Sequence, residues 1–268
     1  MPGTRVGTVR GLWRYPVKSF LGEILQEADF AESGMLGDRA SALVDTETGR
    51  VVSAKNPKRW PRMFQMRAAY VSPPTPGSPL PMVRFTFANR PPFTADDPSA
   101  EAHLSEVLGR PVTISHGVAG AARVEEFSPD LTGREGGGVS EFTARSGPFF
   151  DAQPVHLVTT GSLARLAAAH PAGRFDPCRF RPNILVESEE PEAEVSWPGR
   201  TLSIGDAMQL DVTRPCGRCV MTTLAQGDLP EELAILRTAV SLTKGKVGVY
   251  GTVARPGPVR VGDPVTLS

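Results

Sequence analysis

The stretch RVGTVRGLWRY, residues 5–15, alternates apolar and polar side chains, the pattern of a β-strand with one buried face. The stretch ASALVDTETGRVVSAK, residues 40–55, repeats this alternation around a turn at Glu47–Gly49 and predicts a hairpin. Similar runs follow at residues 65–74 and 81–95, on either side of a proline-rich loop. The first ninety residues are therefore predicted to be rich in β-strands.

Further strands are predicted in the second half of the chain, at residues 181–188, 201–213, 219–225 and 247–268. Two helical patterns interrupt them. Residues 97–110 have Asp97 as a candidate N-cap, Pro98 in the first turn and Gly109 at the end. Residues 154–170, PVHLVTTGSLARLAAAH, indicate a strand that runs into a short amphipathic helix. The predicted fold class is α+β and β-dominated, with a few short helices.

Residues 117–147 differ from the rest of the chain, because they are rich in glycine and charge and show no sustained periodicity. This segment is predicted to be a long loop or a linker. It divides the chain into two β-dominated domains, residues 1–116 and 148–268. A chain of 268 residues is long enough for two cores of modest size.

The composition excludes several classes of protein. Lys and Arg balance Asp and Glu at 29 each, so no overall charge draws the chain to nucleic acid or to an anionic membrane. No stretch approaches the ~20 apolar residues that span a bilayer, and the N-terminus lacks the apolar run of a signal peptide. Three cysteines argue against a disulfide framework. We expect a cytoplasmic protein that binds neither nucleic acid nor membrane.

Two of the cysteines lie in TRPCGRCVMTT, residues 213–223, where Cys216 and Cys219 form a C-x-x-C pair. A structural zinc site requires two more ligands, and the four histidines are scattered. A thioredoxin-like site requires a helix after the pair, but residues 219–225 have a strand-like composition. Two buried thiols remain an alternative. Arg214 and Arg218 favour instead a thiolate that is available to a soft metal.

Basic residues stand at predicted strand ends in both halves of the chain. Lys18 and Ser19 follow one strand in YPVKSFLG, Arg39 precedes the strand in GDRASALVD, and Arg179 and Arg181 precede another in RFRPN. Each alone is most simply a solvated surface residue. Together with the cysteine pair they indicate a phosphate-bearing cofactor between the two domains.

Five short motifs in order give the chain a resemblance to the MOSC family, named after the C-terminal domain of molybdenum cofactor sulfurase. They are YPVKS (15–19), GDR (37–39), FRPN (180–183), RC followed by TT (218–219 and 222–223) and VGDPV (261–265). The order is similar to that of the two-domain members, in which an N-terminal MOSC β-barrel domain precedes a MOSC β-barrel domain. Amidoxime reducers and bacterial reductases of N-hydroxylated bases belong to this group.

The resemblance implies a molybdenum cofactor and a role for each matching residue. Cys219 would ligate the molybdenum, and Asp151 would be the acidic residue near the metal that passes a proton to the leaving water. The implied cofactor-binding residues are Lys18, Ser19, Arg39, Arg179, Arg181, Asn183 and Arg218. The chain departs from the amidoxime reducers at Ala152, where they carry a hydroxyl, and at Arg179, where they carry an asparagine.

The favoured function is therefore a molybdenum-dependent oxidoreductase that reduces N-hydroxylated small molecules such as hydroxylamines, amidoximes and N-hydroxylated bases. The sequence has no iron–sulfur, flavin or haem motif. Electrons are expected from a separate donor, a ferredoxin or a cytochrome b5-like protein with its reductase. Two alternatives stay open, sulfur transfer through a Cys219 persulfide and non-catalytic carriage of the molybdenum cofactor.

Overall fold

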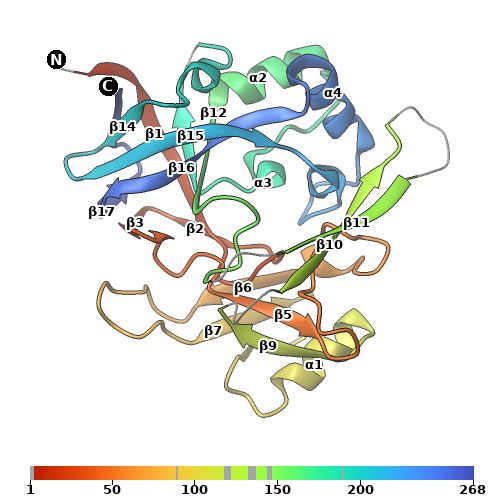
Figure 1. The fold of residues 1–268 in the computed structure, drawn as a ribbon. Helices are drawn as coiled ribbons and strands as arrows, with labels where there is room; N and C mark the ends of the chain where they lie inside the picture. The colour runs from red at the N-terminus through yellow and green to blue at the C-terminus, as the bar shows by residue number, and fades with distance from the viewer. Residues whose placement is uncertain (1–2, 89, 118–121, 132–136, 144–146, 189) are drawn as a thin grey trace.

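The computed structural model of the chain describes residues 3–88, 90–117, 122–131, 137–143, 147–188 and 190–268. A barrel forms the upper part of the molecule in Figure 1, and smaller sheets from the N-terminal half lie below it. The prediction of a β-dominated chain with a few short helices is confirmed.

Seven strands close the barrel, and the first strand of the chain completes it. β1 (Thr4–Arg14) pairs antiparallel with the last strand, β18, on one side and with β13 on the other. The remaining strands of the ring are β13 (Ile184–Glu187), β12 (Val155–Thr159), β16 (Lys246–Arg255), β15 (Met208–Gly217), β14 (Thr201–Ile204) and β18 (Pro264–Leu267). Residues 5–15 thus form a strand, as predicted, but this strand lies in the barrel of the C-terminal half.

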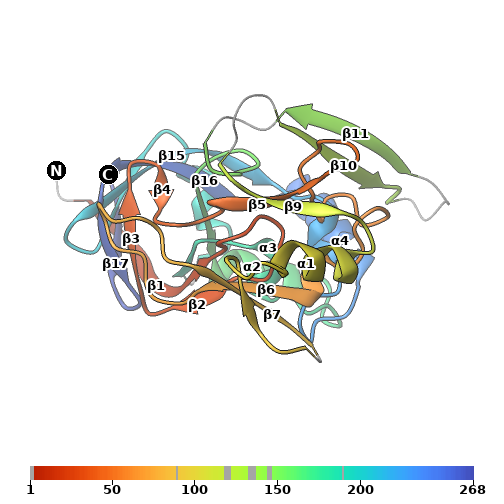
Figure 2. The ribbon, with the colours of Figure 1, turned by 90° about the horizontal axis from the view of Figure 1, so that it is seen from below.

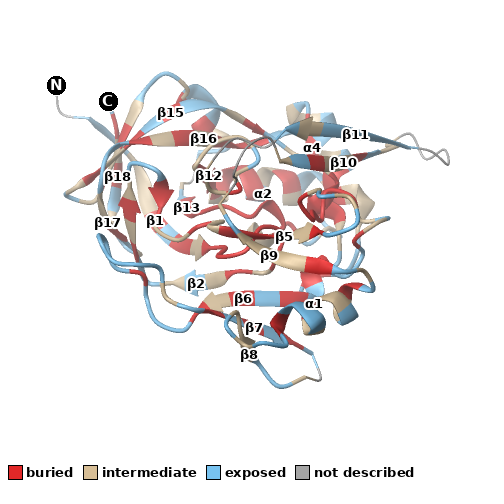
Figure 3. Ribbon diagram, turned by 60° about the horizontal axis from the view of Figure 1, so that its bottom comes forward, coloured by how far each residue is buried: buried red, intermediate tan, exposed pale blue. Residues whose placement is uncertain are grey.

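Apolar side chains from alternate positions fill the barrel. Val9 and Leu12 of β1 pack with residues such as Leu157, Ile184 and Leu210, all of which are fully or almost fully buried. Figure 3 shows this burial as the red segments of the strands. Shorter strands extend the barrel: β2 (Glu23–Leu25) pairs with β1, and β3 (Glu27–Ala31) pairs with β4 (Gly34–Met35) and β17 (Gly257–Arg260).

The N-terminal half builds a second core between two small sheets and a helix. One sheet contains β5 (Ser41–Asp45) and β9 (Val112–His116), and the other contains β6 (Met66–Tyr70), β7 (Val83–Phe87) and β8 (Phe93–Thr94). The 3-10 helix η1 (Met63–Gln65) and the helix α1 (Ala100–Leu108) complete it. Gly109 ends α1 in the left-handed conformation, as predicted, whereas Asp97 lies before the helix and accepts a hydrogen bond from Ser99 N.

The predicted hairpin at residues 40–55 is only partly present. The turn exists, since Gly49 N donates to Asp45 O at 2.8 Å, and it brings Val44 opposite Val51. Val51 also pairs with Val124, and after the hydrogen bond from Val52 N to Leu43 O the chain leaves β5. The second half of the expected hairpin is therefore a loop, which carries Ser53, Lys55 and Asn56.

The helices of the C-terminal half flank the barrel. They are α2 (Thr160–Ala169), α3 (Pro177–Phe180), η2 (Ala193–Ser196), η3 (Val220–Thr223) and α4 (Leu233–Thr243). The strand-to-helix prediction for residues 154–170 is confirmed by β12 and α2. The strand prediction for residues 219–225 is wrong, because the 3-10 helix η3 lies at their centre. The helix α4 was not predicted from the sequence. Among the described helices, none has the length and the apolar character needed to cross a membrane.

The prediction of a loop at 117–147 is wrong for half of that segment. β10 (Arg123–Pro129) and β11 (Gly137–Thr143) form an antiparallel hairpin, which Figure 2 shows along one side of the molecule. Residues 118–121, 132–136 and 144–146 of the predicted linker lie outside the described residues. The proposed division into domains at 116 and 148 stays a prediction.

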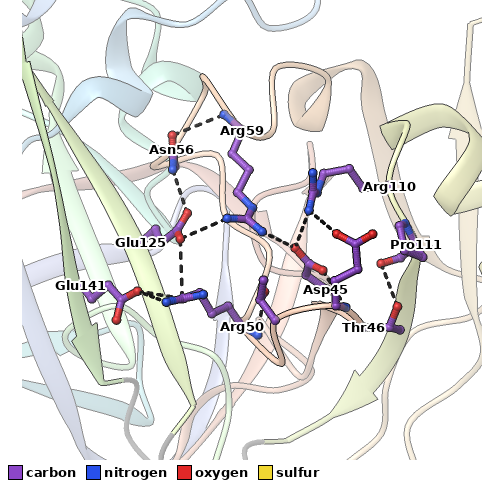
Figure 4. A network of polar contacts seen from close by, with 11 residues as sticks. Asp45, Thr46, Arg50, Asn56, Arg59, Arg110, Pro111, Glu125 and Glu141 are labelled. Atoms are coloured by element: carbon purple, nitrogen blue, oxygen red, sulfur yellow. Dashed lines mark hydrogen bonds and ion pairs between the residues drawn. The ribbon is translucent and has the colours of Figure 1, made fainter.

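A polar network holds this hairpin against the N-terminal half (Figure 4). Glu125 and Glu141 stand opposite each other on β10 and β11, and Arg50 bridges them at 3.5 and 2.5 Å. Arg59 joins Glu125 to the buried carboxylate of Asp45. The hairpin is thereby fixed to the loop that carries Lys55.

Candidate functional site

A cleft of about 400 Å³ lies between the barrel and the N-terminal half. Its walls contain all nine residues singled out in the sequence: Lys18, Ser19, Arg39, Asp151, Arg179, Arg181, Asn183, Arg218 and Cys219. These residues come from segments up to 201 positions apart in the chain. The structure therefore brings the predicted residues together in one place, while their chemical roles stay predictions.

Three of these residues have a backbone conformation that residues other than glycine rarely adopt. Ser19, Arg39 and Arg181 have φ angles of 63°, 49° and 53°, in the left-handed region. Each such residue costs about 1–2 kcal/mol relative to a right-handed one. Left-handed residues other than glycine tend to occur where function requires a particular direction of the side chain. Their grouping on one cleft supports a binding site there.

The cleft is strongly basic although the chain as a whole is neutral. Seven basic side chains line it against two acidic ones, an excess of five positive charges. The basic residues are Lys18, Arg39, Lys55, Arg179, Arg181, Arg214 and Arg218, and the acidic ones are Glu126 and Asp151. A concave surface with this excess attracts anions such as phosphate.

Asp151 lies between two ammonium groups. One carboxylate oxygen accepts from Lys18 Nζ, and the other lies 3.6 Å from Lys55 Nζ. Burial would raise the pKa of Asp151, but the two lysines outweigh it and hold that pKa well below its usual range. Asp151 is therefore ionised at neutral pH. The predicted role of Asp151, to pass a proton to the leaving water, stays a prediction.

Arg39 and Arg181 are anchored to the main chain on the cleft wall. Arg39 forms an ion pair with the buried Asp38 and donates to Arg181 O at 3.3 Å. Arg181 donates to Phe20 O at 2.7 Å. Burial lowers the pKa of Arg181 to about 10, which still leaves a cation at neutral pH. Both residues line the cleft, and each guanidinium group has more N–H donors than the acceptors that the described residues give it.

The two cysteines of the C-x-x-C pair have different surroundings. Cys219 is half-buried, caps the start of η3 and lines the cleft. Cys216 is fully buried, and its sulfur accepts a hydrogen bond from Arg218. Burial raises the pKa of both thiols; Lys55 opposes this at Cys219 and Arg218 at Cys216. Of this pair, only Cys219 offers its sulfur to the cleft.

Three predicted cofactor-binding residues have contacts that point to another role. The Arg179 side chain is fully buried and donates to the carbonyls of Arg174, Thr222, Leu224 and Pro230. Asn183 links the backbone of His156 to Trp13 O. Arg218 donates to Phe180 O at 2.8 Å as well as to Cys216. Arg179 and Asn183 thus hold the walls of the cleft through main-chain atoms, and their predicted contacts with a cofactor stay predictions.

Four further residues of the cleft were not identified from the sequence: Lys55, Glu126, His156 and Tyr250. Lys55 Nζ lies 3.4 Å from Glu126 on β10. Burial lowers the pKa of Lys55, but Asp151 and other neighbours raise it above its ordinary value. Burial also lowers the pKa of His156 well below its ordinary value, so this imidazole is neutral. Lys55 stands at the end of the predicted hairpin and His156 within a predicted strand, but no motif in the sequence marks either residue as part of a site.

The side chains that the structure describes contain no group of three or more His, Cys, Asp or Glu residues able to hold a metal ion. One soft ligand, the Cys219 sulfur, lines the cleft, so a molecule that brings its own metal ligands together with an anionic group would suit it. A pterin dithiolene with a phosphate is such a molecule, and the basic cleft with one thiol on its wall fits it.

Comparisons with known proteins agree with the motifs. Residues 6–123 match the MOSC N-terminal beta barrel domain, and residues 143–266 match the MOSC domain. The mitochondrial amidoxime-reducing component 1 of Mus musculus is 28% identical over 98% of this chain and 83% of its own length. The Homo sapiens protein of the same name is 27% identical over the same shares.

Two further similarities extend this set. The mitochondrial amidoxime reducing component 2 of Rattus norvegicus is 25% identical over 97% of this chain and 83% of its own length. Among solved structures, the YUAD protein from Bacillus subtilis aligns with 97% of this chain and 94% of its own, at 14% identity and a TM-score of 0.47.

Proposed function

This chain belongs to the MOSC proteins that carry both the N-terminal barrel domain and the MOSC domain, and we propose from that premise that it is a molybdenum-dependent oxidoreductase that reduces N-hydroxylated compounds. One observation carries the proposal: residues from four of the five motifs, together with Asp151, meet in one basic cleft with a half-buried thiol on its wall. The amidoxime-reducing names of its relatives support the substrate class.

The molybdenum cofactor would be held at both of its ends. Cys219 Sγ would ligate the metal, because a thiolate is a soft ligand. Lys18, Ser19, Arg39 and Arg181 would bind the phosphate with charge-assisted hydrogen bonds. Burial keeps the free Cys219 thiol protonated, so metal binding would release this proton. Arg179 and Asn183 would act indirectly, through the segments that they fix.

When bound, the cofactor supplies two-electron chemistry, by which an N–OH compound takes up two electrons and two protons and yields an N–H compound and water. The protein has to bring protons to the leaving oxygen. Asp151 is ionised and holds Lys18 and Lys55 in place through its two oxygens. Asp151 stays the proposed proton carrier, because an ionised carboxylate at the cleft wall can take up a proton from solvent and pass it on, with Lys55 Nζ 3.6 Å away to offset its charge.

We propose that electrons come from a separate protein, a ferredoxin or a cytochrome b5-like protein with its reductase. The three cysteines are free, in keeping with a reducing compartment such as the cytoplasm.

The test is turnover of the molybdenum-loaded chain with a chemical electron donor. Benzamidoxime, an N-hydroxyguanidine and an N-hydroxylated base would be supplied with reduced methyl viologen, and the deoxygenated products would be quantified. We expect product from at least one of them. A loaded chain that reduces none of the three, and that carries a persulfide on Cys219 by mass spectrometry, would favour sulfur transfer instead.

A further inference from the structure

Tyr15 contacts both of the arginines that we propose to bind the phosphate. Its ring centroid lies 4.6 Å from Arg39 Cζ and 4.1 Å from Arg181 Cζ. Tyr15 is 3% exposed and does not itself line the cleft, whereas both guanidinium groups do. One buried ring therefore touches two cations that come from segments 142 positions apart.

Backbone hydrogen bonds also hold Tyr15 beside Asp38 and Arg39. Tyr15 N donates to Asp38 Oδ1 at 2.8 Å, and Arg39 N donates to Tyr15 O at 2.6 Å. Asp38 in turn forms the ion pair with Arg39. The backbone of Tyr15 and the side chain of Arg39 are thus linked through one buried carboxylate, which leaves the ring little freedom to turn away.

The aromatic ring, rather than the hydroxyl group, makes the contacts. Within the described part of the chain the buried Tyr15 Oη has no hydrogen-bond partner. Burial also raises the pKa of Tyr15, so the phenol stays neutral and adds no charge to the site. What remains is the negative face of the ring, which attracts guanidinium groups.

The arginines need such a contact. Both adopt the left-handed backbone conformation, and both are positively charged groups on the same wall. Arg181 makes a second aromatic contact, with Phe64 at 5.3 Å. Like charges repel, so without the ring the two guanidinium groups would move apart or towards solvent.

We infer that Tyr15 is a positioning residue for anion binding: its ring holds Arg39 and Arg181 in the arrangement that receives a phosphate group. This inference rests on the proposed function, in which the cleft binds the phosphate of the cofactor. It predicts that the ring, and not the hydroxyl, sets the affinity for phosphate.

The test uses the full chain, produced in a host that makes no pterin cofactor, and inorganic phosphate as the probe in isothermal titration calorimetry. Tyr15→Leu removes the ring and should weaken phosphate binding about tenfold, the scale of a shielded cation–π contact. Tyr15→Phe keeps the ring and should restore the wild-type affinity. Should Tyr15→Leu fail to fold, Tyr15→Met, whose longer and unbranched side chain adapts better to the space left by the ring, takes its place.

The matched control is Tyr70→Leu. Tyr70 is also a buried tyrosine against an arginine, with its ring centroid 5.1 Å from Arg14 Cζ, but neither residue lines the cleft. This variant should melt earlier and keep its affinity for phosphate. Wild-type affinity in Tyr15→Leu, or equal loss in Tyr15→Phe, would overturn the inference. A wild-type chain that binds no phosphate would instead overturn the anion-binding cleft of the proposed function, and the role of Tyr15 with it.

Discussion

Asp151 carries a carboxylate that touches two ammonium groups on one cleft. The side chain is 32% exposed, whereas the Lys18 side chain is only 5% exposed. Among the described residues, removal of the negative charge would leave the Lys18 ammonium group with Phe149 O, at 3.1 Å, as its hydrogen-bond acceptor. The ion pair should therefore contribute to stability as well as to the electrostatics of the cleft.

Asp151→Asn is expected to lower the free energy of unfolding by about 1–2 kcal/mol at pH 7. This is the usual contribution of a charge-assisted hydrogen bond, reduced because the Asp151 side chain is partly exposed. The pKa of Asp151 is lowered in the folded state, so its contribution is complete above the unfolded value of about 3.9 and is lost as the pH falls through the lower folded value. The gap between wild type and variant should therefore begin to narrow as the pH falls below about 4. Urea unfolding between pH 3 and pH 8 measures it.

Asp228→Asn is the control for this prediction. Asp228 also pairs with an arginine, Arg174, but its side chain is 83% exposed. Its removal should change the unfolding free energy by less than about 0.5 kcal/mol. A pH-independent difference between Asp151→Asn and wild type would contradict the ionised carboxylate described here.

At the scale of elements, η3 places Cys219 on the cleft wall, and Arg179 holds η3. The guanidinium of Arg179 donates to Thr222 O and Leu224 O at 3.2 Å each, and to Pro230 O at 2.7 Å. A planar group with five donors is suited to this task, and a lysine is not. The 3-10 helix is too short to be stable by itself, so its position depends on these contacts.

Arg179→Met is expected to destabilise the chain by about 3–5 kcal/mol, because several carbonyl oxygens lose their donor inside the protein. The amides of residues 220–226 should exchange with deuterium faster than in wild type, as measured by mass spectrometry. Arg174→Met, an exposed neighbour, should change neither quantity. If Arg179→Met keeps its stability and only loses affinity for phosphate, Arg179 is a direct anion ligand after all.

At the scale of the molecule, barrel closure depends on β1, which joins the two ends of the ring. Gly7 lies where β1 passes close to β13. A Cβ atom at this position would come within 2.3 Å of Glu187 O and 2.6 Å of Val186 Cγ1. Only glycine lets the two strands approach this closely.

Gly7→Ala should therefore lower the free energy of unfolding by about 1–3 kcal/mol, the usual cost of an atom forced into a packed region. Urea midpoints measure this effect. Gly138→Ala in β11 serves as the control, since a Cβ atom there meets nothing within 4 Å. Equal midpoints for the two variants would show that β1 does not close the barrel as described.

The sequence predicts what depends on local pattern. The alternation in residues 5–15 and the helical pattern after Asp97 correspond to β1 and α1, because strand and helix periods act over neighbouring residues. It does not predict which strands pair, since β1 meets β13 and β18 from more than 170 positions away. For the same reason Lys55 went unnoticed: its two acidic partners are supplied by β10 and by residue 151.

Two errors of the prediction from sequence can be traced to particular contacts. The β-branched run after Cys219 resembles a strand, but Thr222 and Thr223 turn their hydroxyls onto the carbonyls of Cys219 and Val220 and stabilise a 3-10 helix instead. The stretch at 117–147 contains a hairpin, because Arg50 offsets the repulsion between Glu125 and Glu141 from outside the segment. In the first case local side-chain hydrogen bonds outweigh strand propensity, and in the second a tertiary contact outweighs the loop-like composition.

The central claim is tested most directly by the metal content of three chains expressed with molybdate and analysed by mass spectrometry: wild type, Cys219→Ser and Cys216→Ser. We expect about one molybdenum per wild-type chain and a loss of roughly tenfold or more in Cys219→Ser. Cys216→Ser should keep near wild-type content, because of the two sulfurs only that of Cys219 lines the cleft. Equal loss in both variants, with zinc recovered in place of molybdenum from the wild type, would contradict it.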